Sequence, residues 1–119
     1  MKSELKNTNS NKLVAKPFKY SDLVAYQKET IVSRTLIDKT TGTVTVFAFD
    51  ATQRLSTHSA PFDALVEVID GKGIFTIEDQ VFELKSGEQI IMPANKPHSV
   101  EAAEKFKMVL IMIKSNTTS

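Results

Sequence analysis

From residue 87 to residue 98 the chain reads GEQIIMPANKPH. A Ser-Gly turn opens this stretch, the mainly apolar residues 89–92 predict a short strand, and the proline-bounded residues 93–97 predict a tight loop. His98 follows the loop directly. The stretch therefore predicts a short strand, a loop and an imidazole side chain in immediate succession.

The residues around this stretch alternate between apolar and polar with period two, the spacing of a β-strand. Residues 43–49 are rich in β-branched and aromatic side chains, and a turn at residues 39–42 pairs them with residues 31–37. Further strands are predicted at residues 64–69, 74–78, 81–85 and 105–113. No long helix is predicted. Short strands joined by short turns indicate an all-β sandwich or barrel.

Length and composition exclude several classes of protein. The chain has 119 residues, about one domain, and no cysteine, which excludes disulfides, thiol nucleophiles and Cys-ligated metal clusters and fits a reducing compartment. A net charge of +1 without a basic stripe argues against a nucleic-acid partner. The longest apolar run, residues 108–113, is far shorter than the ~20 residues of a membrane span. With no apolar block near the N-terminus to serve as a secretory signal, we expect a cytoplasmic protein with no membrane partner.

The expected organisation is a single domain at residues 13–114. Residues 1–12 and 115–119 are almost entirely polar, and we expect a flexible arm and a flexible tail there. Within the first apolar cluster of the domain, Ser21 and Asp22 could cap one short helical turn.

Some predicted strands are apolar on both faces, as at residues 64–66 and 109–111. Such strands are covered on both sides, either by a second sheet or by a second subunit. We therefore expect a homodimer.

The chain contains two histidines, His58 and His98, 40 residues apart. Each stands beside turn-forming residues at a strand end. Two imidazoles at the mouth of a barrel can converge on one ligand or one metal ion. The plain structural alternative is that each ring is hydrogen-bonded or simply exposed.

At these positions the chain resembles the small single-domain cupins, an RmlC-like family with a jelly-roll barrel. The second cupin motif, G-x5-P-x-G-x2-H-x3-N, is matched by Gly87, Pro93 and His98. Asn95 replaces the motif glycine, and asparagine tolerates a positive φ at such a turn. Ala102 replaces the final asparagine. The resemblance implies a cupin-type double-stranded β-helix, that is, a jelly-roll barrel.

The first cupin motif, G-x5-H-x-H-x3-4-E-x6-G, is matched in spacing but not in chemistry. His58 stands at the first histidine position and Gly71 at the closing glycine. Ala60 replaces the second histidine, Ala64 the glutamate and Thr52 the leading glycine. In this respect the chain looks like a subgroup of bacterial cupins of unassigned function.

Metal-binding cupins offer three histidines and one glutamate to a divalent ion. The resemblance thus implies a degenerate site in which His58 and His98 are the remaining ligands for Ni, Zn, Fe or Mn. Two imidazoles without a carboxylate fall short of the usual zinc and non-haem iron sites. Asp63 and Glu67 flank the lost glutamate in sequence, but strand parity predicts that they face away from Ala64.

The alanines leave space and an apolar wall where the metal of the family sits, which favours a small-molecule pocket over a metal centre. For the inward-facing residues of this wall, simple core packing is the structural alternative. The candidate ligand-binding residues are His58, His98, Ala60, Ala64, Val66, Phe106 and Met108.

Three functions remain open, because a fold does not fix a function. The first is a non-catalytic barrel that binds a small, largely apolar molecule, with His58 and His98 as polar anchors. The second is a metal-dependent enzyme of the dioxygenase or isomerase type with a reduced two-histidine site. The third is metal-free acid–base catalysis with His98 as the base, for which Tyr20 and Tyr26 are the tyrosines available as partners. A nucleotide-sugar substrate would also need basic contacts, and Arg34 and Arg54 are the only arginines in the sequence.

Overall fold

The computed structural model describes residues 5–6 and 11–115. Their regular structure is almost entirely β, with two short 3-10 helices at Asn11–Leu13 and Tyr20–Asp22. None of the helices in the described residues is long and apolar enough to span a membrane. The strands are β1 (Leu5–Lys6), β2 (Ile31–Lys39), β3 (Gly42–Phe49), β4 (Arg54–His58), β5 (Phe62–Asp70), β6 (Lys72–Ile77), β7 (Gln80–Lys85), β8 (Gln89–Met92), β9 (His98–Ala102) and β10 (Phe106–Lys114).

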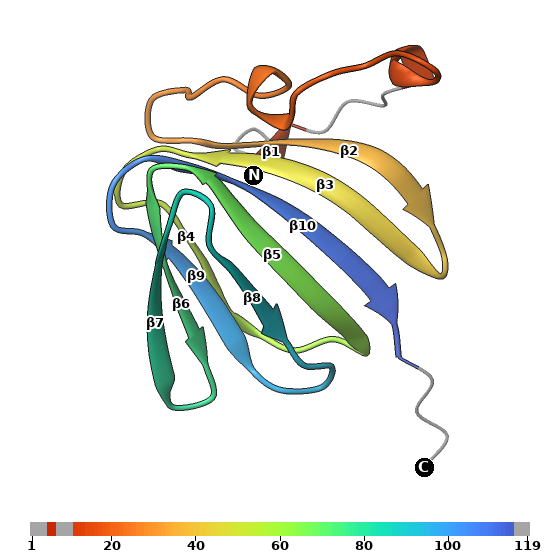
Figure 1. Cartoon of the computed structure of the whole chain (residues 1–119). Helices are drawn as coiled ribbons and strands as arrows, with labels where there is room; N and C mark the ends of the chain where they lie inside the picture. The colour runs from red at the N-terminus through yellow and green to blue at the C-terminus, as the bar shows by residue number, and fades with distance from the viewer. Residues whose placement is uncertain (1–4, 7–10, 116–119) are drawn as a thin grey trace.

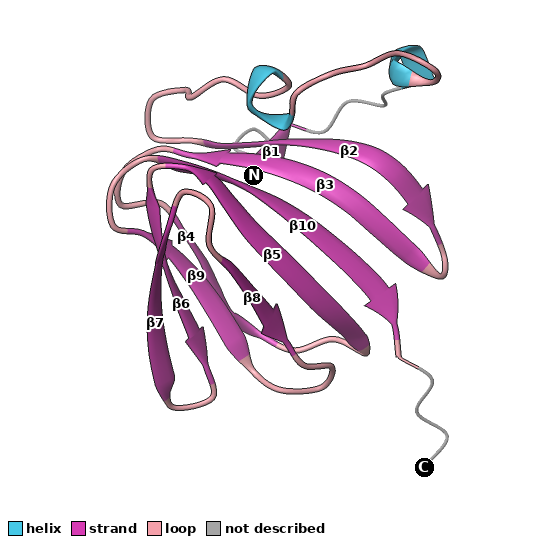
Figure 2. Cartoon of the chain, viewed as in Figure 1, coloured by secondary structure: helices cyan, strands magenta, loops and turns pink. Residues whose placement is uncertain are grey.

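The strands form two facing sheets (Figure 1, Figure 2). The larger sheet has the order β1-β2-β3-β10-β5-β8 and the smaller sheet the order β4-β9-β6-β7. All pairs are antiparallel except β1 with β2. Strands distant in sequence thus lie side by side, with β10 between β3 and β5, and β9 between β4 and β6. This arrangement confirms the predicted all-β jelly-roll barrel.

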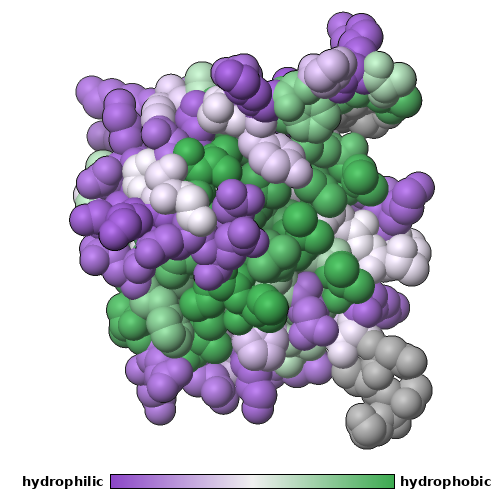
Figure 3. Space-filling view, in the orientation of Figure 1, coloured by the Kyte–Doolittle hydropathy of each residue, from purple (hydrophilic) through white to green (hydrophobic). Residues whose placement is uncertain are grey.

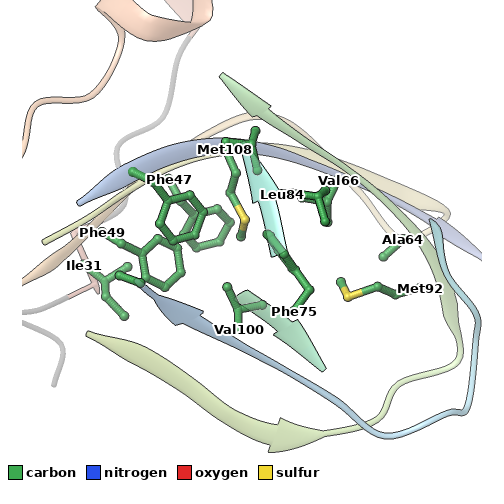
Figure 4. Packing of buried hydrophobic residues seen from close by; sticks show 13 residues of the cluster. Ile31, Phe47, Phe49, Ala64, Val66, Phe75, Leu84, Met92, Val100 and Met108 are labelled. Carbon is green, nitrogen blue, oxygen red and sulfur yellow. The ribbon is translucent and has the colours of Figure 1, made fainter. Parts of the chain in front are cut away.

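The core lies between the two sheets because alternate residues of each strand point inward. Phe106 stacks on Phe49 with ring centroids 4.7 Å apart, and Phe75 meets Phe106 edge to face at 6.0 Å. Away from this aromatic group, the interior is lined by Ala64 and Met92 (Figure 4). The barrel is therefore aromatic in one part of its interior and occupied by small and flexible side chains in another.

A second apolar cluster lies on the outer face of the larger sheet. Val24, from the segment that precedes β2, packs with Val46 of β3 and Val109 of β10. The Lys107 ammonium donates a hydrogen bond to the Ser21 carbonyl at 2.8 Å and ties the segment to the sheet. The N-terminal segment therefore covers part of the second apolar face that the sequence analysis assigned to a second sheet or a second subunit.

Beyond this segment part of the outer face is apolar, with Leu65 and Ile111 partly buried and Ile91 and Ile113 exposed. Leu65 of β5 pairs with Ile91 of β8 and with Ile111 of β10, so three large apolar side chains form one cross-strand row. Ile91 is 64% exposed and Ile113, further along β10, is 62% exposed. Figure 3 shows apolar side chains gathered in a band across the molecule, with polar side chains around it.

The four positions at which the two motifs carry glycine all have positive φ. Gly71 and Gly87 have φ values of +75° and +93°. Thr52 and Asn95, which replace the other two glycines, have φ values of 69° and 65°. The backbone of both motifs is thus retained where the residues have changed. At Asn95 this is the expected tolerance of asparagine, whereas for the β-branched Thr52 the conformation is strained.

Two details differ from the sequence-based expectations. The predicted helical turn is present at Tyr20–Asp22, but its N-cap is Lys19 and no side chain caps it, so Ser21 and Asp22 lie within the turn. The strands β1, β4 and β9 were not predicted, although β4 and β9 carry both histidines. β1 lies within the expected flexible arm, where Leu5 and Lys6 pair with β2. Of the expected arm and tail, residues 1–4, 7–10 and 116–119 lie outside the described residues, and the domain bounds stay a prediction.

Candidate functional site

His58 and His98 are neighbours across two antiparallel strands. His58 is the last residue of β4, His98 is the first residue of β9, and the two are register partners. Their ring centroids are 4.5 Å apart and the planes are inclined by 65°, an edge-to-face arrangement. Two residues separated by 40 positions in the sequence are thus brought into contact.

Backbone carbonyls fix the orientation of both imidazoles. His58 Nδ1 lies 2.9 Å from the Ser56 carbonyl oxygen, and His98 Nδ1 lies 3.2 Å from the Lys96 carbonyl oxygen. A carbonyl oxygen only accepts hydrogen bonds, so each Nδ1 carries the proton and donates it. The nitrogen that remains for a ligand is therefore Nε2, which bears a lone pair on the neutral ring.

The surroundings of His98 favour this neutral form. Burial lowers the pKa of His98 below its ordinary value, and the nearby His58 lowers it further. Because both effects disfavour the imidazolium, the ring is neutral at pH 7 and its Nε2 acts as an acceptor or a ligand rather than as a cation.

The two histidines open onto a small cavity of about 40 Å³ inside the barrel. This volume is far below the roughly 300–1,000 Å³ of pockets for drug-sized ligands. No carboxylate and no cationic side chain contributes to its wall. The lining residues are Leu55, His58, Ala64, Met92, His98, Val100, Met108, Leu110 and Met112.

The loop between β8 and β9 places His98 at this cavity. Asp63 accepts a hydrogen bond from the Ala94 backbone N–H at 2.9 Å, and the Asn95 N–H donates to the Ala60 carbonyl at 2.8 Å. The exposed Asp63 is directed to the loop while Ala64, 2% exposed, faces the core. The prediction that Asp63 faces away from Ala64 is confirmed. The Asp63 carboxylate holds the loop between β8 and β9 in place.

The structure brings together only part of the predicted ligand-binding set. His58, His98, Ala64 and Met108 line the cavity. Val66 and Phe106 are fully buried in the core without lining it, and Ala60 contributes its carbonyl to the loop contact described above. A role of these three residues in binding stays a prediction.

Sequence reasoning missed Met92, Leu55 and Val100 as cavity residues. Met92 directly precedes the motif proline, so its inward direction could have been inferred from the alternation along residues 89–92. Leu55 and Val100 lie on β4 and β9, which contain only one and two apolar residues and so are too short to show a clear alternation. The structure also separates His98 from the two tyrosines suggested as its acid–base partners, because Tyr20 and Tyr26 pack in the outer cluster.

The ligand set of the metal-binding cupins does not fit this site. Two of its four positions hold alanines, and Asp63, the neighbouring carboxylate, is directed to the loop. Within residues 5–6 and 11–115, no group of three His, Cys, Asp or Glu side chains is arranged to hold a metal ion. The donors that remain of the family's ligand set are two imidazoles without a carboxylate, fewer than the usual zinc and non-haem iron sites provide.

Comparison with known proteins agrees with the fold. A family model described as a cupin domain matches residues 45–114. A conserved protein of unknown function from Streptococcus pyogenes is 33% identical, with a TM-score of 0.82 over 87% of this chain and 90% of the other. A cupin 2 conserved barrel domain protein from Leptotrichia buccalis is 42% identical, with a TM-score of 0.77 over 79% of this chain and 46% of the other. None of the curated proteins matches this chain.

Proposed function

This chain belongs to the cupin family, and we propose that its barrel is a non-catalytic binding module for a small, mainly apolar molecule. The site is the cavity at His58 and His98. The observation that carries the proposal is the pair of imidazoles whose Nδ1 atoms are held by backbone carbonyls, beside a cavity walled otherwise by apolar side chains.

The chemistry of the site limits the ligand. Because both Nε2 atoms are acceptors, the polar end of the ligand must donate a hydrogen bond, as an alcohol or an undissociated acid does. A cavity of about 40 Å³ admits only a few non-hydrogen atoms. Flexible methionine side chains in the wall allow it to adapt to a somewhat larger apolar group.

A thermal-shift screen of small alcohols and acids tests the proposal. A binding compound at 100 times its Kd is expected to stabilise the protein by roughly 2.7 kcal/mol. The stabilisation is expected to disappear in His58→Asn and His98→Asn. Lys96→Gln is the matched control, since it changes an exposed side chain of the same loop and leaves the carbonyl bound to His98 in place. A panel in which no compound acts through the histidines would refute the proposal.

The second candidate is a metal-dependent enzyme of the dioxygenase or isomerase type. It is favoured by one observation, because histidine ligands of metals commonly donate their second N–H to a carbonyl, as both histidines do here. Elemental analysis of untagged protein, purified without a metal-affinity step, decides between the two. About one equivalent of Ni, Zn, Fe or Mn per chain, lost in His98→Asn, would favour the enzyme.

We also propose that the protein is a homodimer in which the row of Leu65, Ile91 and Ile111, exposed at Ile91 and partly buried at the other two, meets the same row of a second copy. A contiguous apolar patch of this kind is uncommon on a monomer, and a sheet face can pair with itself about a two-fold axis. Ile91→Glu is expected to give a folded monomer in size-exclusion chromatography with light scattering. Val81→Glu, an equally exposed change on β7, is the control and is expected to leave the dimer intact. A wild-type protein that elutes as a monomer at all concentrations would contradict the proposal.

The absence of cysteine supports a reducing compartment, and we propose the cytoplasm. Fractionation of the source cells with an antibody against the protein tests this assignment.

A further inference from the structure

Sulfur atoms and imidazoles are concentrated in one place. The sequence contains four methionines and two histidines. Both histidines line the cavity, and so do Met92, Met108 and Met112, which are all the methionines apart from Met1. In Figure 4 the side chains of Met92 and Met108 lie inside the barrel. Three thioethers and two imidazoles around one cavity can act as metal ligands as well as packing groups.

The strand register places two thioethers around the position of the missing carboxylate. Ala64, which replaces the motif glutamate, pairs with Met92 on β8 and with Met112 on β10. Side chains directly opposite each other on neighbouring strands have Cβ atoms about 4.5–5.5 Å apart. Met92 and Met112 therefore flank Ala64 on both sides, and its small methyl group leaves room between them.

This donor set has a definite chemical preference. Thioether sulfur is a soft, uncharged ligand that selects Cu(I), and imidazole nitrogen also suits copper. No anionic side chain of the described residues lines the cavity to balance the second charge of a divalent ion. A monovalent soft ion therefore matches this donor set better than Zn²⁺ or Ni²⁺ does.

We propose that the cavity binds one Cu(I) ion through His58, His98 and the thioethers of Met92 and Met112. The hydrogen bonds from both Nδ1 atoms to carbonyls leave each Nε2 as the coordinating nitrogen. The cavity of about 40 Å³ accommodates a single ion. This inference goes beyond the proposed function. Because Cu(I) and the small molecule would both bind to Nε2 of His58 and His98, the two ligands compete.

Anaerobic titration of the metal-free protein with Cu(I), in competition with a chromophoric Cu(I) chelator, tests the inference. One equivalent is expected to bind per chain, with much weaker binding of Zn(II) and Ni(II). Met92→Leu and Met112→Leu preserve side-chain volume and the fold. Since even the hydrogen-bond partner of a ligand contributes about 10–100-fold to metal affinity, each substitution is expected to weaken Cu(I) binding at least about 10-fold. Ile90→Leu is the matched control, because Ile90 is a partly buried residue of β8, the strand of Met92, and does not line the cavity.

A spectroscopic measurement identifies the ligands directly. In protein labelled with ¹³C at the methionine methyl groups, Ag(I) serves as a redox-inert probe of the same site. The methyl resonances of Met92 and Met112 are expected to shift, while that of Met1 remains as an internal reference. Binding that is unchanged in the Met92→Leu/Met112→Leu double variant, or a shift at Met1 alone, would overturn the inference.

The two proposals fail in different ways. If Cu(I) does not bind but a small alcohol still stabilises the protein through His58 and His98, the copper site is refuted and the proposed function stands. If Cu(I) binds through the methionines and no small molecule acts through the histidines, the copper site stands alone.

Discussion

Replacing Gly71 with alanine is expected to destabilise the fold by about 2–5 kcal/mol. Gly71 joins β5 to β6 with a φ of +75°, which costs an L-residue about 1–2 kcal/mol. An added Cβ would also lie 2.1 Å from the Lys105 carbonyl oxygen and 2.9 Å from Phe106 Cα. Backbone atoms cannot move aside as a side-chain end can, so the crowding adds roughly 1–3 kcal/mol. Urea unfolding followed by circular dichroism measures the loss.

The Gly87→Ala variant separates the cost of the positive φ from the cost of crowding by the added Cβ. Gly87 also has a positive φ, +93°, but an added Cβ would meet nothing within 4 Å. Only the conformational cost of about 1–2 kcal/mol is expected there. If both variants lost the same stability, the close approach of the Lys105 and Phe106 backbone to Gly71 would have no energetic importance.

The fold was predictable because both of its determinants are local. Period-two alternation and the turn-forming residues between the apolar runs located seven strands, and the spacing of the two motifs then indicated the family and its fold. Thr52 and Asn95 show why spacing was the better guide than residue identity. Both keep the positive φ of the glycine they replace, so the backbone path was conserved although the residue types were not.

The strands β4 and β9 escaped prediction for a physical reason. β4 reads RLSTH, and only Leu55 is both apolar and partly buried. β9 reads HSVEA, with the buried positions divided among Ser99, Val100 and Ala102. Two or fewer apolar residues per strand form too short a pattern to indicate a strand without its hydrogen-bonded neighbours, and a single sequence does not reveal those neighbours.

Which side chains line the cavity depends on the register between paired strands. That register is set by pairing between strands that are distant in the sequence. The sequence indicated that Ala64 faces inward, and the structure agrees. That Met92 and Met112 stand on either side of Ala64 follows only from the pairing of β5 with β8 and β10. Likewise, the contact between His58 and His98 required β4 and β9 to be neighbours.

Replacing Phe106 with alanine is expected to cost about 3–5 kcal/mol. Its ring is completely buried, stacked on Phe49 at 4.7 Å and in edge contact with Phe75 at 6.0 Å. The space left behind cannot collapse easily, since it lies between two sheets held by their own hydrogen bonds. For a domain of this size the midpoint of thermal unfolding is expected to fall by about 10–20 °C, which calorimetry or circular dichroism measures.

The same variant tests whether Phe106 takes part in binding. Because Phe106 does not line the cavity, Cu(I) binding or alcohol binding below the unfolding temperature is expected to remain within about twofold of the wild type. Phe18→Ala is the control for loss of a phenyl ring, since Phe18 is 44% exposed and its loss is expected to cost about 1 kcal/mol or less. A Phe106→Ala protein of nearly normal stability that no longer binds would reverse the assignment. In that case the binding site would extend from the methionine-rich cavity into the aromatic part of the core.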